Sequence, residues 1–328
     1  MMTVAFAEPK TKANSEHSHP IADIATDKNE ARARRAAMAD VKSWAIQLRF
    51  LNRTSLSAAP VDLIVIDHAP HPEKDVEIPF TREEIAPLKL KPDGHRRIVL
   101  AYLSVGEAER YRYYWKPAWD VAGTRPQWLG PENPKWPGDF QVRFADPDWQ
   151  AIIFGAQVSY LDSIIAAGFD GVYLDRVDAF QDVEETMPGA EDAMTGFVQR
   201  LSDHARRLNP KFLVVMQNAE ELANSKSLLS HIDGLSKEDL QFGFDDGDAP
   251  NPPQMVSDSI AYLRKAKRSG VKVLVLEYAA TPERIATAQT LSRREGFLLH
   301  TTVRMLDTLS VDDDTHPEAG TAPVSSPQ

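Results

Sequence analysis

The stretch Gly168-Phe-Asp-Gly-Val-Tyr-Leu-Asp-Arg-Val-Asp-Ala-Phe180 places two carboxylates directly after a short run of strand-forming residues. Val172–Leu174 has the composition of a buried strand, and glycine-containing turns precede it. Asp175 and Asp178 follow this run. In a barrel of parallel strands, the C-terminal ends of the strands form the mouth in which catalytic groups lie. We therefore predict that this stretch delivers acidic groups to such a mouth.

Short apolar runs of the same kind recur along the chain and alternate with longer helical stretches. Leu63–Ile66 and Val273–Leu276 show no polar alternation, as expected for parallel strands that helices cover on the outside. The pattern predicts an α/β fold, specifically a (β/α)8 TIM barrel over residues 41–309. The eight predicted strands are Trp44–Phe50, Asp62–Asp67, Arg97–Leu103, Gly171–Asp175, Phe212–Met216, His231–Leu235, Lys272–Leu276 and Gly296–Thr301.

Capping residues and helix breakers predict the helices between these strands. Thr81-Arg-Glu-Glu84 has the pattern of a capping box, and Thr281-Pro-Glu283 places proline at the first position of a helix. Asp148 is predicted to cap a single helix that ends at Gly168. Two further helices are predicted at Asp192–Leu208 and Ser257–Ser269.

Both ends of the chain are polar and are predicted to lie outside the barrel. Residues 1–40 are expected to form a disordered tail with a short helix near Ala31–Val41, and residues 310–328 a second disordered tail. Ala5-Phe-Ala7 has the small-x-small form of a signal-peptide cleavage site. Two interpretations stay open: a signal-peptide remnant, which would indicate a periplasmic or secreted protein, or an ordinary tail, which is compatible with a cytoplasmic location.

One connection is much longer than the others. Residues 104–145 follow the third strand and exceed the usual strand-to-helix loop of about 2–6 residues. This aromatic-rich insertion could be a small core that packs the loop onto the barrel, or a platform whose flat faces bind sugar rings, and both can hold at once. Its tyrosines and tryptophans are Tyr111, Tyr113, Tyr114, Trp115, Trp119, Trp128 and Trp136.

Acidic residues follow six of the eight predicted strands. A single Asp after a strand is often only a helix cap. Several carboxylates at one barrel mouth, however, repel one another and raise one another's pKa, which supports general acid and base chemistry. The residues are Asp67, Glu107, Asp175 with Asp178, Glu220, Glu238 and Glu277.

Composition excludes several classes of function. The chain has 37 Lys and Arg against 48 Asp and Glu, a formal net charge of −11, which disfavours nucleic acid and favours a basic substrate. No apolar run is long enough for stable membrane insertion, and no cysteine is present. Nucleotide-binding motifs and metal-binding histidine pairs are also absent. We therefore expect a hydrolase that uses two carboxylates and needs no cofactor or metal; its oligomeric state stays open.

Several ordered motifs together resemble glycoside hydrolase family 114, the endo-α-1,4-polygalactosaminidases and their bacterial relatives. The resemblance extends from about Trp44 to Thr302. It rests on Trp44-Ala-Ile-Gln-Leu48, Asp62-Leu-Ile-Val-Ile-Asp67, Val99-Leu-Ala-Tyr-Leu-Ser-Val-Gly-Glu-Ala-Glu109, Tyr111-Arg-Tyr-Tyr-Trp115, Gly168-Phe-Asp-Gly-Val-Tyr-Leu-Asp175, Gln217-Asn-Ala-Glu220 and Val275-Leu-Glu-Tyr278.

The resemblance implies a (β/α)8 barrel that cleaves α-1,4-linked galactosamine-containing exopolysaccharide. It implies a catalytic pair of Asp175, after the fourth strand, and Glu238, near the sixth, with Glu220 as the rival partner. Because Arg176 should favour the ionised form of Asp175, we expect Asp175 to be the nucleophile or stabiliser and Glu238 the acid/base. An aminosugar polymer is the expected partner, and the residues expected to bind it are Asp67, Tyr102, Glu107, Trp115, Tyr173, Asp178, Glu220, Glu277 and Tyr278.

Alternatives to these assignments remain at this stage. The three tyrosines Tyr102, Tyr173 and Tyr278 fit inner-barrel packing as well as a site wall, and Asp178 fits a helix cap. For the whole protein, the alternatives are a barrel that binds glycans without cleaving them and a hydrolase of another polysaccharide.

Overall fold

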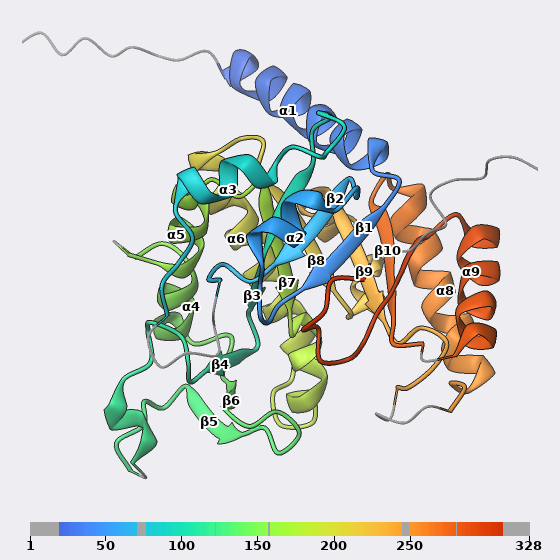
Figure 1. Ribbon diagram of the computed structural model, residues 1–328. Helices are drawn as coiled ribbons and strands as arrows, with labels where there is room; N and C mark the ends of the chain where they lie inside the picture. Colours follow the sequence, from blue (N-terminus) through green and yellow to red (C-terminus); the bar gives the residue numbers. More distant parts are fainter. Residues whose placement is uncertain are drawn as a thin grey trace, which may run out of the picture.

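The computed structural model describes residues 20–70, 77–121, 123–156, 158–244, 249–279 and 281–310. Within these residues, eight parallel strands form one sheet in the order β1-β2-β3-β7-β8-β9-β10-β11 (Figure 1). The strands are β1 (Trp44–Gln47), β2 (Leu63–Ile66), β3 (Ile98–Ser104), β7 (Gly171–Asp175), β8 (Leu213–Gln217), β9 (Gly234–Glu238), β10 (Lys272–Glu277) and β11 (Leu298–Thr301). Of the predicted tails, residues 1–19, including Ala5-Phe-Ala7, and residues 311–328 lie outside the described residues.

The sheet curls until its first and last strands are neighbours. The indole N–H of Trp44 on β1 donates to the carbonyl of Leu298 on β11 at 2.9 Å, and Leu48 N donates to Leu306 O at 2.8 Å. The prediction of a (β/α)8 barrel is therefore confirmed. Strand β9 begins and ends three residues later than predicted. The residues up to Asp233 form a turn instead, because Asp233 is bound to β8, where its Oδ2 accepts from Val214 N at 3.0 Å.

Helices lie between most of the strands, as the capping residues and helix breakers predict. Thr81 and Glu84 form the predicted capping box. One prediction was wrong: residues 147–167 form two helices rather than one, capped by Asp146 and Ser159, because the chain turns at Gly155, whose φ is +89°. The outer helices are α2 (Arg53–Ala58), α3 (Arg82–Leu88), α4 (Pro147–Ile153), α5 (Tyr160–Ala167), α6 (Ala190–Leu208), α7 (Lys226–His231), α8 (Pro253–Arg268) and α9 (Pro282–Glu295). Short 3-10 helices are η1 (Pro117–Asp120), η2 (Val177–Val183) and η3 (Glu220–Asn224).

Helix α1 (Pro20–Asp40) covers the N-terminal end of the barrel. It begins before the short helix that the sequence predicts, and its buried Met38 packs on the inward residues of the strands. Arg34 lies 3.4 Å from Asp233, and Lys272 Nζ donates to Val41 O at 2.6 Å. Figure 1 shows α1 across one end of the barrel, with the insertion beyond the other. No helix in the described ranges has the length and apolar character needed to cross a bilayer.

Alternation along the strands decides which residues face the barrel interior. The interior cluster is apolar near α1 and includes Trp44, Ile46, Leu63, Val65, Leu100, Tyr173, Val215, Leu274 and Leu276. Because successive side chains of a strand point to opposite faces, the same inward rows continue to polar residues at the C-terminal ends. These residues are Asp67, Tyr102, Asp175, Gln217, Glu238 and Tyr278. The interior therefore changes from apolar to acidic along the barrel axis.

The aromatic-rich insertion forms a three-stranded antiparallel sheet in the order β4-β6-β5. Its strands are β4 (Glu107–Glu109), β6 (Asp139–Val142) and β5 (Leu129–Glu132). Ala108 and Phe140 are buried on one face, where the ring centroids of Trp115 and Phe140 lie 4.8 Å apart. Further ring contacts join Trp115, Trp119, Trp128 and Trp149 in one cluster. This aromatic cluster is continuous with the apolar layer between the barrel and its outer helices, so it packs the insertion onto the barrel, as one of the two interpretations predicts.

Candidate active site

Asp175 is the last residue of β7 and faces the barrel interior from its C-terminal end. The hydroxyl of Tyr102, on the neighbouring strand β3, donates to Asp175 Oδ2 at 2.7 Å. Burial raises the pKa of Asp175, and the negative charge of Glu238 raises it further, while Tyr102 and Arg176 oppose the shift. The expected effect of Arg176 is therefore present, but burial outweighs it.

Glu238 ends β9 and faces the same space. Its Oε1 accepts from the Tyr278 hydroxyl, while its Oε2 accepts from Gln217 Nε2 at 2.9 Å and Asn218 Nδ2 at 3.3 Å. Burial raises the pKa of Glu238, and the hydrogen bonds from Tyr278 and Asn218 oppose the shift. Glu238 thus has three side-chain donors, which favour and orient its carboxylate form.

The backbone after these strands is held in an unfavourable conformation. Arg176, Asn218 and Asp239 have φ values of +57°, +57° and +51°, and each directly follows the last residue of β7, β8 or β9. Left-handed backbone is uncommon outside glycine, and it gathers at functional sites where surrounding contacts hold it. Three consecutive strands therefore end in the same strained turn beside Asp175 and Glu238.

Two of the predicted site residues lie away from this pair. Glu220 begins η3 and accepts from the Ser259 hydroxyl of α8. Glu277 follows the inward Leu276 on β10, so alternation places it on the outer face of the barrel wall. There it is fully buried and accepts from Gln241 N at 2.8 Å, and burial raises its pKa to about 8.

Asp67 faces the mouth from β2 and is held by Arg112. The guanidinium of Arg112 forms a bidentate pair with Asp67, with both N–O distances 2.8 Å. Although burial opposes ionisation, Arg112 holds the pKa of Asp67 well below its usual range. Arg112 also pairs with Glu77 at 2.9 Å and Glu109 at 2.6 Å.

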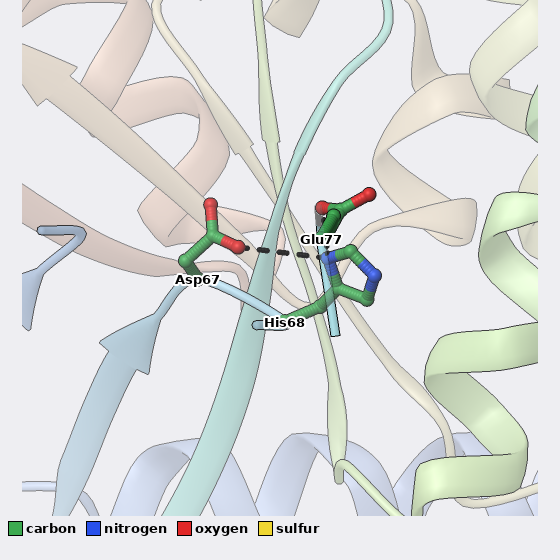
Figure 2. A group of neighbouring side chains, drawn as sticks. All are labelled: Asp67, His68 and Glu77. Atoms are coloured by element: carbon green, nitrogen blue, oxygen red, sulfur yellow. Dashed lines mark ion pairs between the residues drawn. The ribbon is translucent and has the colours of Figure 1, made fainter. Parts of the chain in front are cut away.

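Figure 2 shows His68 between the carboxylates of Asp67 and Glu77. One potential metal ligand atom from each of these residues lies within 4.8 Å of the others. The guanidinium of Arg112 already pairs with both carboxylates, however, and the Tyr160 hydroxyl lies 3.0 Å from His68 Nδ1. The protein itself therefore supplies the positive charge in this cluster.

Arg176 joins two further predicted residues to the site. Its guanidinium lies 3.2 Å from Glu107 and 3.1 Å from Asp178, and it also pairs with Asp182. Asn133 Nδ2 donates to Glu107 at 2.9 Å. Burial raises the pKa of Glu107 and that of Asp178, against the effect of Arg176. Both carboxyls thus lie around the residue that follows Asp175.

The remaining predicted residues differ in position. Tyr102 and Tyr278 hydrogen-bond directly to the candidate carboxyls, whereas Tyr173 lies one layer deeper and donates to Ser236 Oγ at 2.7 Å. Trp115 packs in the core of the insertion, and its indole N–H donates to Asp120 at 3.2 Å.

Sequence reasoning did not select several residues that the structure brings to the mouth. They are Arg112, Asp139, Gln217 and Asn218. Arg112, Gln217 and Asn218 lie within the motifs that carry the family resemblance, so the sequence did contain a signal for these three residues. Asp139 has no such signal, because only the pairing of β6 with β4 places it beside Glu109.

A (β/α)8 barrel with two half-buried carboxyls at its C-terminal mouth has the architecture of a two-carboxylate glycoside hydrolase. Residues 25–314 match the model of glycoside-hydrolase family GH114, and the chain belongs to this family. An uncharacterized protein of Deinococcus radiodurans is 34% identical over 280 residues, which cover 84% of this chain and 85% of that protein. The uncharacterized protein MJ1477 of Methanocaldococcus jannaschii is 36% identical over 264 residues, 78% of this chain and 71% of that protein.

Among solved structures, the glycoside hydrolase domain of PelA from Pseudomonas aeruginosa has a similar fold. The TM-score is 0.59 at 20% sequence identity, and the alignment covers 82% of this chain and 97% of that domain. Family membership supports glycoside hydrolase activity for this protein, and glycoside hydrolases act on saccharide substrates.

Proposed function

We propose that this protein is an endo-α-1,4-polygalactosaminidase, which cleaves a galactosamine-containing exopolysaccharide. The observation that carries the proposal is the pair of carboxyls Asp175 and Glu238. They lie at the C-terminal ends of strands β7 and β9 at the barrel mouth, and the charge of Glu238 acts on Asp175. Membership of family GH114 supports hydrolysis of a glycosidic bond. The acidic mouth favours a basic sugar polymer over a neutral or acidic one.

The two carboxyls perform the two roles that glycoside hydrolysis requires. One donates a proton to the glycosidic oxygen, and the other attacks the sugar or activates water. Glu238 accepts from three side chains, Asp175 from Tyr102, and the charge of Glu238 raises the pKa of Asp175. We therefore place the proton on Asp175 and the negative charge on Glu238. These roles of Asp175 and Glu238 are the reverse of those expected from the sequence.

The test is incubation of the purified protein with galactosamine polymers, followed by measurement of reducing ends and product masses. We expect Asp175→Asn and Glu238→Gln each to lower kcat by a factor of about 10² or more, since each removes a group that takes part in the bond cleavage. Asp203→Asn is the control, because Asp203 is an exposed residue of the outer helix α6. Full activity in both site variants would contradict the assignment.

The same assay separates the alternatives. Binding of the polymer without product would favour a non-catalytic glycan-binding barrel. Cleavage of a different polysaccharide would support the catalytic pair but contradict the proposed substrate. Because the proposed substrate is a polymer outside the cell, we infer a periplasmic or secreted location, which fractionation of the producing cells would test.

A further inference from the structure

One arginine links the ends of three strands on one side of the barrel mouth. Arg304 follows β11, and its guanidinium forms a bidentate pair with Asp239, which follows β9, at N–O distances of 2.9 and 3.1 Å. Its guanidinium carbon lies 4.3 Å from the ring centre of Tyr278, which follows β10. Because β9, β10 and β11 are consecutive in the sheet, Arg304 reaches from one strand end across the next to the third.

Both residues that Arg304 contacts adjoin the candidate catalytic residue Glu238. Asp239 is the next residue in the chain, and the Tyr278 hydroxyl donates to Glu238 Oε1. The side chains of Arg304 and Asp239 are only 30% and 12% exposed, and partly buried pairs are screened by salt much less than exposed ones. Arg304 is therefore placed to act on Glu238 through two of its neighbours.

The backbone of both partners is held by other contacts. Asp239 has a φ of +51°, and its carbonyl accepts from Asn251 Nδ2 at 2.7 Å. On the other side, the carbonyl of Leu306, two residues after Arg304, accepts from Leu48 N at 2.8 Å. The two charged side chains are thus opposite each other before any substrate binds.

Glu238 lies among groups that favour and groups that oppose its ionisation. Burial raises its pKa, the hydrogen bond from Tyr278 lowers it, and the negative charge of Asp239 raises it again. All five strands from β7 to β11, with the residues that follow them, contribute polar or charged groups around Glu238. They are Tyr173 and Asp175 of β7, Gln217 of β8 with Asn218 after it, Lys237 of β9 with Asp239 after it, Tyr278 after β10 and Arg304 after β11.

Two of these groups are cations, and they differ in what they bind. Lys237 directly precedes Glu238 on β9, so alternation turns it to the outer face of the barrel wall, where its Nζ donates to the backbone carbonyl of Glu238 at 2.8 Å. Arg304 pairs instead with Asp239, the carboxylate that opposes ionisation of Glu238. Burial lowers the pKa of Arg304, but its bonds to Asp239 outweigh that effect, so the guanidinium stays charged.

We propose that Arg304 is a positioning residue of the glycosidase, which neutralises Asp239 and thereby keeps Glu238 in the carboxylate form that the reaction requires. This inference rests on the proposed function, which places the negative charge on Glu238. Arg304 needs no contact with the substrate, because it acts through Asp239 and Tyr278. Its cation also lies over the Tyr278 ring, a favourable contact that holds the tyrosine whose hydroxyl donates to Glu238.

The pH profile of three variants tests this role. We would measure kcat/KM for galactosamine polymer from reducing ends between pH 3 and pH 10. Arg304→Met leaves the charge of Asp239 uncompensated, so the pKa of Glu238 rises and the acidic limb should move up by about one pH unit. Asp239→Asn removes that negative charge, so the acidic limb should move down. The double variant removes both charges, and its limb should return close to the wild-type position.

Arg264→Met is the matched control. Arg264, on the outer helix α8, also forms a bidentate pair with a carboxylate, that of Glu295, at 2.6 and 2.9 Å. Its loss should leave the limbs where they are in the wild type. A purely structural role of Arg304 predicts no opposite shifts, so limbs that move in the same direction in Arg304→Met and Asp239→Asn, or in neither, would overturn the inference.

The pKa of Glu238 can also be followed without any substrate. We would label the glutamate side-chain carboxyls of the full chain with 13C, titrate the protein by NMR and assign the signal of Glu238 by its absence in Glu238→Gln. This pKa should rise in Arg304→Met and fall in Asp239→Asn. Both shifts without cleavage of any polymer would contradict the proposed hydrolysis and leave the role of Arg304 standing. Cleavage of the polymer with an unshifted pKa of Glu238 would overturn the inference alone.

Discussion

Replacing Tyr102 by phenylalanine removes the hydroxyl that donates to Asp175 Oδ2 at 2.7 Å and leaves the ring in place. Hydrogen bonds to charged groups contribute about 1.5–3 kcal/mol, and one pKa unit corresponds to about 1.4 kcal/mol. The bond stabilises the carboxylate form of Asp175. A neutral acid also gains about 0.5–1.5 kcal/mol from such a bond, so the difference between the two forms is about 1–1.5 kcal/mol. The loss of the bond should therefore raise the pKa of Asp175 and move the pH limb that depends on it by about one pH unit.

The direction of the change in the pH profile identifies the role of Asp175. If Asp175 is the proton donor, activity is lost when it ionises, so the alkaline limb of kcat/KM should move to higher pH. If Asp175 is the nucleophile, activity requires its ionised form, and the acidic limb should move instead. The measurement is kcat/KM from reducing ends, determined between pH 3 and pH 10 with galactosamine polymer.

Tyr173→Phe is a matched control for this experiment. It also removes a buried tyrosine hydroxyl with a 2.7 Å hydrogen bond, but the partner is Ser236 rather than a carboxyl. We expect its pH limbs to stay within about 0.3 unit of wild type, because no bond to a charged group is lost. Unmoved limbs in Tyr102→Phe would refute the reasoning that this hydrogen bond tunes a catalytic carboxyl.

Two further changes test the buried charges. Arg112→Met leaves Asp67, Glu77 and Glu109 without their shared cation, so the free energy of unfolding measured with urea at pH 7 should fall by about 3–5 kcal/mol; an unchanged urea midpoint would contradict this. Burial raises the pKa of Glu277 from 4.5 to about 8, so the folded state holds a proton that the unfolded state loses, and stability falls as pH rises through this window. Glu277→Gln should therefore stabilise the protein at pH 8 more than at pH 5 in thermal unfolding, and an equal effect at both would refute it.

Much of the fold follows from local patterns in the chain. Unbroken apolar runs and the glycines and prolines between them predict eight strands, since each strand–helix unit carries its own periodicity and capping residues. One error lies where a tertiary contact sets the boundary, since the anchoring of Asp233 to β8 delays the start of β9. The other is local, since the chain turns at Gly155, whose φ is +89°, and this turn divides a predicted helix in two.

The sequence by itself determined which residue types reach the barrel mouth, because acidic residues follow nearly every apolar run. Only the tertiary structure decided which of them face one another. A shift of one residue along a strand turns a side chain to the opposite face, so Tyr278 faces the interior while the adjacent Glu277 lies outside the wall. The extent of β9 brings Glu238 inward, and strand pairing within a distant insertion adds Asp139. Register and long-range pairing depend on the packing of the whole barrel, which no local stretch of sequence contains.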